Sequence, residues 1–136
     1  MKNYVVGFLI SATEVPGVVL IRKNRPDWQV GLWNGVGGHI EEHEGPLEAM
    51  TREFKEETGV TYNDWDNFLT VTYKDCTVWF FKSFTSQDTL IKCRTVTDEP
   101  IKMFSVENLP LNLVPNLRWI IPLALDPYVR VIRAEQ

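Results

Sequence analysis

The chain has 136 residues, of which 44% are hydrophobic and 12% aromatic, and its formal net charge is −4. This length suits one domain with its own core, and the apolar content excludes a disordered chain. The acidic charge argues against a protein that holds duplex nucleic acid by neutralising phosphates. Two cysteines without metal-ligand spacing, Cys76 and Cys93, exclude a disulfide scaffold and make a reducing compartment, the cytoplasm, the expected location. The apolar segment Tyr4–Ile10 is too short to span a bilayer.

The first part of the chain reads as strands and loops. Tyr4–Ser11 and Val18–Arg22 are rich in β-branched and aromatic residues and predict two strands, joined by a turn at residues 14–17. Residues 24–34 are expected to form a loop, since they hold several helix and strand breakers. Six of the eight glycines then fall between residues 31 and 59.

A helix is predicted over residues 46–58. Pro46 suits the first turn, and Gly59 is a C-terminal stop signal. Leu47, Met50 and Phe54 recur at helical spacing, so we expect this stripe to face the core.

The second half of the chain predicts more strands and one further helix. Phe68–Tyr73, Thr77–Phe84 and Ile101–Val106 have strand composition, and Asn116–Leu125 reads as a helix with Asn116 as its N-cap. Strands, a helix, more strands and a final helix together indicate an α+β fold, with a mixed β-sheet sandwiched between helices.

The acidity of the chain belongs to one segment. Seven glutamates and two basic residues lie between Glu41 and Glu57, a local charge of −5, which leaves +1 for the rest. At 100° per residue, Glu53, Glu56 and Glu57 fall within about 100° of arc, away from the apolar stripe. The cluster reads either as a solvated helix face or as hard oxygen ligands for Mg²⁺ or Mn²⁺ shared with a phosphate.

The segment from Gly38 to Val60 resembles the Nudix box, G-x₅-E-x₇-R-E-U-x-E-E-x-G-U, at every fixed position. U stands for a bulky, usually aliphatic residue, and the first of the two U positions holds Phe54 instead. The resemblance implies one Nudix hydrolase domain over residues 1–136, with the Nudix fold and dependence on Mg²⁺, for which Mn²⁺ can substitute. It also assigns the site residues: metal binding to Glu53, Glu56, Glu57 and the Gly38 carbonyl, and an orienting role to Arg52 with Glu44.

The implied reaction is attack by water on a phosphorus of a nucleoside diphosphate linked to a group X, with a carboxylate accepting the proton. The candidates for this general base are Glu53 and Glu57 in the box and Asp98 and Glu99 in a later loop. Cations after the second strand could neutralise substrate phosphates or merely solubilise the surface; they are Arg22, Lys23 and Arg25.

The W-N-G-x-G-G pattern that begins at Trp33 is similar to that of the human-type oxidised-purine nucleotide hydrolases, in which the asparagine contacts the base. It makes Asn34 and Trp33 candidate substrate-binding residues; alternatively, Asn34 is a turn residue beside a core tryptophan. In the MutT-like branch an asparagine near the second helix also reads the purine, which adds Asn112 and Asn116 as candidates.

The expected substrate is a (deoxy)nucleoside triphosphate, including an 8-oxo-dGTP-like form, hydrolysed to monophosphate and pyrophosphate in nucleotide-pool sanitation. ADP-ribose-type and dinucleoside-polyphosphate relatives carry a Pro or a Tyr about sixteen residues beyond the box, where this chain has Cys76. The alternatives are a pyrophosphatase for ADP-ribose or another such diphosphate, and a non-catalytic nucleotide-sensing module, which typically loses box glutamates. We expect a small nucleotide as partner, no stable nucleic-acid complex, no membrane, and a monomer or homodimer.

Overall fold

The computed structural model describes residues 1–130 and 132–135. The strands are β1 (Lys2–Ser11), β2 (Gly17–Arg22), β3 (Trp33–Asn34), β4 (Val36–His39), β5 (Asp66–Thr72), β6 (Cys76–Thr85), β7 (Ile101–Ser105) and β8 (Ile132–Glu135). The helices are the 3-10 turn η1 (Asp27–Gln29), α1 (Pro46–Thr58), α2 (Gln87–Ile91) and α3 (Leu117–Leu125).

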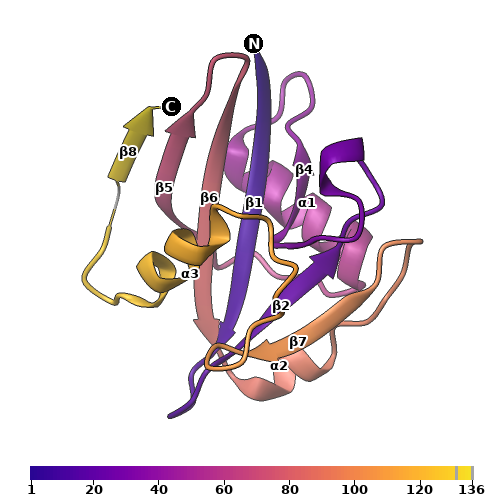
Figure 1. Ribbon diagram of the computed structural model, residues 1–136, viewed down its shortest axis with the longest axis vertical. Coiled ribbons are helices and arrows are strands. Elements are labelled where there is room, and N and C mark those ends of the chain that lie inside the picture. The colour runs from indigo at the N-terminus through magenta and orange to yellow at the C-terminus, as the bar shows by residue number, and fades with distance from the viewer. Residues whose placement is uncertain (131, 136) are drawn as a thin grey trace.

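A mixed sheet runs through the molecule in the order β3-β2-β1-β6-β5-β8 (Figure 1). β1 and β6 lie parallel at its centre, and β8 pairs parallel with β5 at one edge. β1 and β2 share only the pair Ile10↔Val18, after which β4 takes over the edge of β1 and β7 pairs with β2. β4 therefore leads from the middle of the sheet directly toward α1.

Two cores pack on opposite faces of this sheet. Because successive side chains of a strand alternate between faces, Phe8 and Ile10 of β1 join the core under α3, whereas Val5 and Leu9 join the core under α1. Figure 1 shows α1 behind the sheet and α3 in front of it. The α+β class, with a mixed sheet between helices, is confirmed.

α1 begins and ends at the predicted residues. Glu48 Oε1 accepts a hydrogen bond from the Gly45 N–H at 3.3 Å, which satisfies a free donor at the N-terminus. Gly59 ends the helix with φ +78°, in the left-handed region that favours glycine. Met50 and Phe54 are fully buried, and this burial contributes about 1.5–3 kcal/mol each.

One part of the predicted apolar stripe is wrong: Leu47 is 47% exposed. The buried residues of α1 are Ala49, Met50, Phe54 and Thr58, so the face toward the sheet is rotated away from the first turn. Five short elements were not predicted, namely η1, α2, β3, β4 and β8. In the described part of the chain, no helix is long and apolar enough to cross a membrane.

Candidate functional site

Gly38 on β4 makes room for a carboxylate of α1. A Cβ built on Gly38 would lie 2.6 Å from the carboxyl carbon of Glu53, so a side chain there would force this carboxylate to move. The neighbouring Gly37 is held against β1, since a Cβ there would lie 1.9 Å from the Val5 carbonyl oxygen. The two glycines thus let β4 pass between β1 and the polar face of α1.

Arg52 is the centre of an ion-pair network on this face. Its Nε and Nη2 donate to the two oxygens of Glu44, at 2.7 and 2.9 Å, so the predicted pair is present in bidentate form. Nη2 also donates to the His39 carbonyl at 2.9 Å, and Nη1 to Glu53 at 2.9 Å and Glu56 at 3.2 Å. These contacts raise the pKa of Arg52 and lower that of Glu44, through their hydrogen bond above all.

Glu53 and Glu57 are partly buried carboxylates close to other acids. Desolvation by burial raises the pKa of Glu53, although its hydrogen bond to Arg52 opposes the shift. Desolvation likewise raises the pKa of Glu57, which Lys23 lowers and Glu99 raises further. Glu57 also accepts a hydrogen bond from Thr97 Oγ1 at 3.3 Å. The negative charges of Glu53 and Glu57 therefore lie close to other acids at positions where water solvates them only in part.

Glu99 is 2% exposed and joins the later loop to the end of β2. Its Oε1 accepts a hydrogen bond from Lys23 Nζ at 3.1 Å, and its Oε2 accepts one from the Asn24 N–H at 2.6 Å. Arg25 Nη1 lies 3.7 Å from Glu99 Oε1, and Arg25 Nη2 lies 2.6 Å from Asp98 Oδ2. The hydrogen bond to Arg25 lowers the pKa of Asp98.

The structure thus brings most of the predicted charged residues together. Glu53, Glu56 and Glu57 share one side of α1, and Glu99 is close enough to Glu57 to affect its pKa. Two of the three predicted phosphate-binding cations, Lys23 and Arg25, are already paired with acids of the later loop. The third, Arg22, is exposed at the end of β2.

The donor set suits a hard divalent cation. Carboxylate oxygens are the ligands that Mg²⁺ and Mn²⁺ prefer, and half-buried carboxylates with raised pKa values favour added positive charge. Among residues 1–130 and 132–135, however, no three acidic, histidine or cysteine side chains converge in the manner of a formed metal site. Arg52, which bonds both Glu53 and Glu56, supplies the positive charge there.

The predicted base-reading residues lie around β3. Asn34 donates from Nδ2 to Gln29 Oε1 at 3.0 Å and accepts at Oδ1 from the Gly35 N–H at 2.8 Å. Trp33 is partly buried and packs edge-on against Phe104, with ring centroids 4.9 Å apart. Asn34 is the last residue of β3, paired with Ile21 of β2, and each end of its amide has a protein partner.

The other two candidate asparagines differ from Asn34 and from each other. Asn112 is exposed and donates from Nδ2 to the Gly31 carbonyl at 2.8 Å. Asn116 stands at the N-cap position of α3, but its side chain makes no capping hydrogen bond, so the predicted capping role is wrong. It instead donates from Nδ2 to the Tyr73 hydroxyl at 2.9 Å. This tertiary contact competes successfully with the local one.

Sequence reasoning did not predict the contacts that three polar residues make: Asn24 holds Glu99, Thr97 donates to Glu57, and Tyr73 accepts from Asn116. All three lie in loops outside the box and act on residues far away in the sequence. No local spacing pattern marks them.

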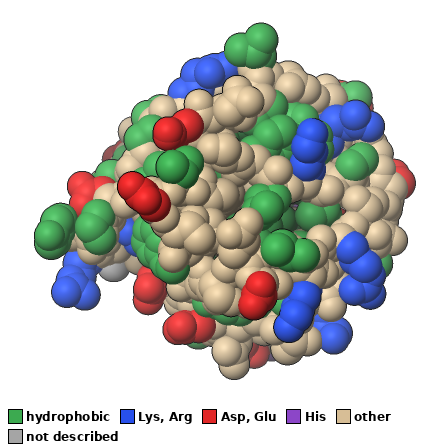
Figure 2. Space-filling model, turned by 90° about the horizontal axis from the view of Figure 1, so that it is seen from below, with side chains coloured by type: hydrophobic (Ala, Val, Ile, Leu, Met, Phe, Trp, Pro, Cys, Tyr) green, Lys and Arg blue, Asp and Glu red, His purple; other side chains and the backbone are tan. Residues whose placement is uncertain are grey.

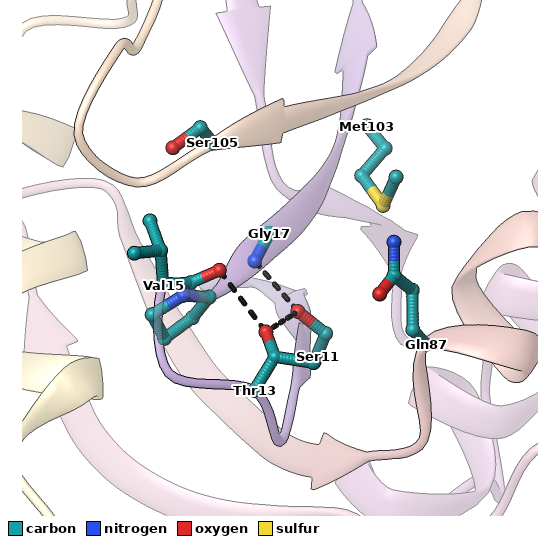
Figure 3. Close-up of a pocket in the computed structure, with 8 residues that line it drawn as sticks. Ser11, Thr13, Val15, Gly17, Gln87, Met103 and Ser105 are labelled. Atoms are coloured by element: carbon teal, nitrogen blue, oxygen red, sulfur yellow. Dashed lines mark hydrogen bonds between the residues drawn. The ribbon is translucent and has the colours of Figure 1, made fainter.

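Two hollows lie apart from these residues. A hollow of about 170 Å³ is found at the β1–β2 hairpin, at the lower end of the molecule that Figure 2 shows. Ser11, Thr13 and Gly17 on its wall bond mainly one another (Figure 3), and no titratable side chain lines it. A second hollow, of about 580 Å³, is lined in part by Gly59 and Arg94. Neither contains the carboxylates of α1.

Comparison with known proteins identifies the family of this chain. A sequence model of the NUDIX domain matches residues 1–124, while comparison with curated proteins gave no match. The NUDIX domain of Shewanella oneidensis NrtR, solved with ADP ribose, is 20% identical, with a TM-score of 0.72 over 90% of this chain and 84% of that one. The MutT NUDIX hydrolase from Burkholderia pseudomallei is also 20% identical, with a TM-score of 0.70 over 93% and 100%.

A MutT/nudix family protein from Enterococcus faecalis is 18% identical, with a TM-score of 0.67 over 76% of this chain. This chain spans only 43% of that protein. At such identities the structural likeness shows the fold, whereas the sequence model covers most of the chain. The chain therefore belongs to the NUDIX family and is classed with the Nudix pyrophosphohydrolases.

Proposed function

We propose that the protein hydrolyses a (deoxy)nucleoside triphosphate, including an 8-oxo-dGTP-like form, to the monophosphate and pyrophosphate with Mg²⁺. The observation that carries this proposal is the carboxylate face of α1. Glu53 and Glu57 are partly buried, their pKa values are raised, and Glu56 lies beside them on the same helix. Cationic side chains of the 22–25 segment lie close by.

Nudix hydrolases generally depend on a divalent metal ion. In this chain Glu53, Glu56, Glu57 and the Gly38 carbonyl would hold it, and Mn²⁺ could take the place of Mg²⁺. A bound divalent cation neutralises phosphate oxygens and lowers the pKa of water.

The remaining charged residues have separate tasks in the proposal. Arg52, paired with Glu44, orients the carboxylates of α1. Arg22 and Lys23 face the substrate phosphates, and Lys23 is held by Glu99. A carboxylate takes the proton of the attacking water: Glu53, Glu57, Asp98 or Glu99.

Base recognition is assigned to the region around β3. Trp33 forms an apolar wall there, and Asn34 contacts the base edge. Asn116 is a second candidate, since its Oδ1 is a buried polar atom without a partner. It belongs to the same region because the Val114 N–H, two residues before it, donates to the Trp33 carbonyl at 2.9 Å. A purine offers both donors and acceptors to such amides.

A second candidate substrate is ADP-ribose or another nucleoside diphosphate linked to a group X. The similar NUDIX domain solved with ADP ribose favours it. A non-catalytic nucleotide-sensing module is disfavoured, since every glutamate of the box is present. The proposal also includes a cytoplasmic location and a role in nucleotide-pool sanitation, in keeping with two free cysteines.

The test is a hydrolysis assay of the purified protein with Mg²⁺. The panel holds the nucleoside triphosphates, 8-oxo-dGTP and ADP-ribose, and the products are separated by chromatography. The proposal expects a monophosphate and pyrophosphate from at least one triphosphate. Hydrolysis of ADP-ribose alone would replace it with the second candidate, and tight binding without hydrolysis would favour the sensing module.

A further inference from the structure

Asn116 carries an unusual polar atom. Its Oδ1 has less than 1 Å² of exposed surface, and no group in residues 1–130 and 132–135 donates a hydrogen bond to it. No other buried side-chain nitrogen or oxygen in this part of the chain lacks a partner. Since an unsatisfied buried acceptor costs about 1–3 kcal/mol, such an atom in a folded protein points to a ligand or another use.

Tyr73 holds the other end of the same amide. Its hydroxyl accepts from Asn116 Nδ2 at 2.9 Å, and its own backbone N–H donates to the Cys76 carbonyl at 2.8 Å in the β5–β6 turn. The ring also packs against the core under α3. Tyr73 is therefore anchored through both its backbone and its ring, and it fixes which end of the amide faces away.

The core that Tyr73 joins offers further apolar side chains. Val6, Val78 and Trp33 are partly buried side chains that pack on the same core as Tyr73. Trp33 exchanges backbone hydrogen bonds with Asn112 and Val114, just before Asn116. Because Oδ1 is closed off from solvent, a group that pairs with it must be inserted between side chains, as the edge of a base can be.

We propose that Tyr73 is a specificity-determining positioning residue: by binding Nδ2 it leaves Asn116 Oδ1 as a fixed acceptor, so that the site selects bases with an N–H donor. This inference rests on the proposed nucleotide hydrolysis and adds the hydrogen-bonding requirement. Without the Tyr73 hydroxyl, the Asn116 amide is free to turn and present either a donor or an acceptor.

The test compares inosine triphosphate, whose base has an N–H donor, with the triphosphate of unsubstituted purine, which has none. In the wild type, kcat/KM is expected to favour inosine triphosphate at least about tenfold, the effect of one good hydrogen bond. Tyr73→Phe is expected to reduce this ratio toward one, with less change in kcat than in KM. Tyr62→Phe is the matched control, because the Tyr62 hydroxyl bonds only Ser83 on the other core and its loss should leave the ratio unchanged.

A double-mutant cycle separates positioning from a general loss of packing. In an Asn116→Leu background, Tyr73→Phe should alter the ratio no further, because Tyr73 acts through Asn116. An unchanged ratio in Tyr73→Phe, or an equal loss in Tyr62→Phe, would overturn the inference while leaving the hydrolase proposal intact. If the wild type hydrolyses no nucleotide, the proposed function itself fails.

Discussion

The carboxylate face of α1 and the amide-lined region around β3 differ in where their contacts come from along the chain. Arg52 bonds partners that are at most 13 residues away, from His39 to Glu56. Asn116 bonds Tyr73, 43 residues away, and Asn112 bonds Gly31, 81 residues away. One segment thus builds the Arg52 network on α1, although Thr97 also reaches Glu57 from a later loop, whereas packing of distant segments sets the contacts of Asn112 and Asn116. In our proposal the first sets the rate for every substrate, and the second sets which base is accepted.

The largest effect is expected from the carboxylates of α1. Glu56→Gln and Glu57→Gln should each lower kcat about 100-fold or more, because each removes a proposed metal ligand, while residues that only orient ligands cost less. The fold should remain, since neither side chain is part of the buried face of the helix. Steady-state kinetics measures the loss of kcat, and circular dichroism measures whether the fold remains. Glu42→Gln, an exposed change of equal charge, is the control, and near-wild-type turnover in both variants would remove the assignment.

Loss of Arg52 should affect both stability and rate. Arg52→Ala leaves Glu44 and Glu53 without their main cation, so we expect a loss of about 2 kcal/mol in the free energy of unfolding and a 10- to 100-fold lower activity, the approximate range for such partners. Arg52→Lys should restore little, because lysine lacks the bidentate fork. Urea denaturation and kinetics test this, with Lys55→Ala on the same helix as control; wild-type behaviour of Arg52→Ala would contradict it.

A change on the amide side should alter preference more than rate. For Asn34→Ala we expect a change of about tenfold in the ratio of kcat/KM between oxidised and normal purine triphosphates, as one hydrogen bond is lost. Asn63→Ala, an exposed asparagine of another loop, should leave the ratio unchanged. An unaltered ratio in Asn34→Ala would exclude Asn34 from base reading.

The smallest expected effect is on stability as a function of pH. Burial raises the pKa of Glu57 above its usual 4.5, so the folded protein holds this proton more tightly than the unfolded chain does. The stability from this group is full below the unfolded pKa and is lost as pH rises through the folded one. Glu57→Gln should therefore gain stability relative to wild type between pH 4 and pH 7, in urea denaturation with a chelator present. A constant difference across that range would contradict the assignment.

The carboxylate face of α1 could be predicted from the sequence because its residues lie close together along the chain. α1 has the predicted bounds, and helical spacing placed Glu53, Glu56 and Glu57 on one side of it. The Arg52–Glu44 pair followed from the box. Leu47 was misplaced because spacing alone does not tell which arc of a helix meets the sheet.

The amide side could not be read in this way. Asn116 has the sequence context of an N-cap, yet a tyrosine from another strand end binds its side chain. α2 and β8 have only five and four residues, too few for a clear hydrophobic period, and β8 exists through its pairing with β5. A single Nudix domain over residues 1–136 stays a prediction.

One measurement tests the division between the two sides most directly: kcat/KM across the nucleoside triphosphates for wild type, Glu57→Gln and Asn34→Ala. We predict that Glu57→Gln lowers every value by the same factor and keeps their ratios, whereas Asn34→Ala changes the ratios between bases. A change of base preference in Glu57→Gln, or an equal loss for all bases in Asn34→Ala, would contradict the account.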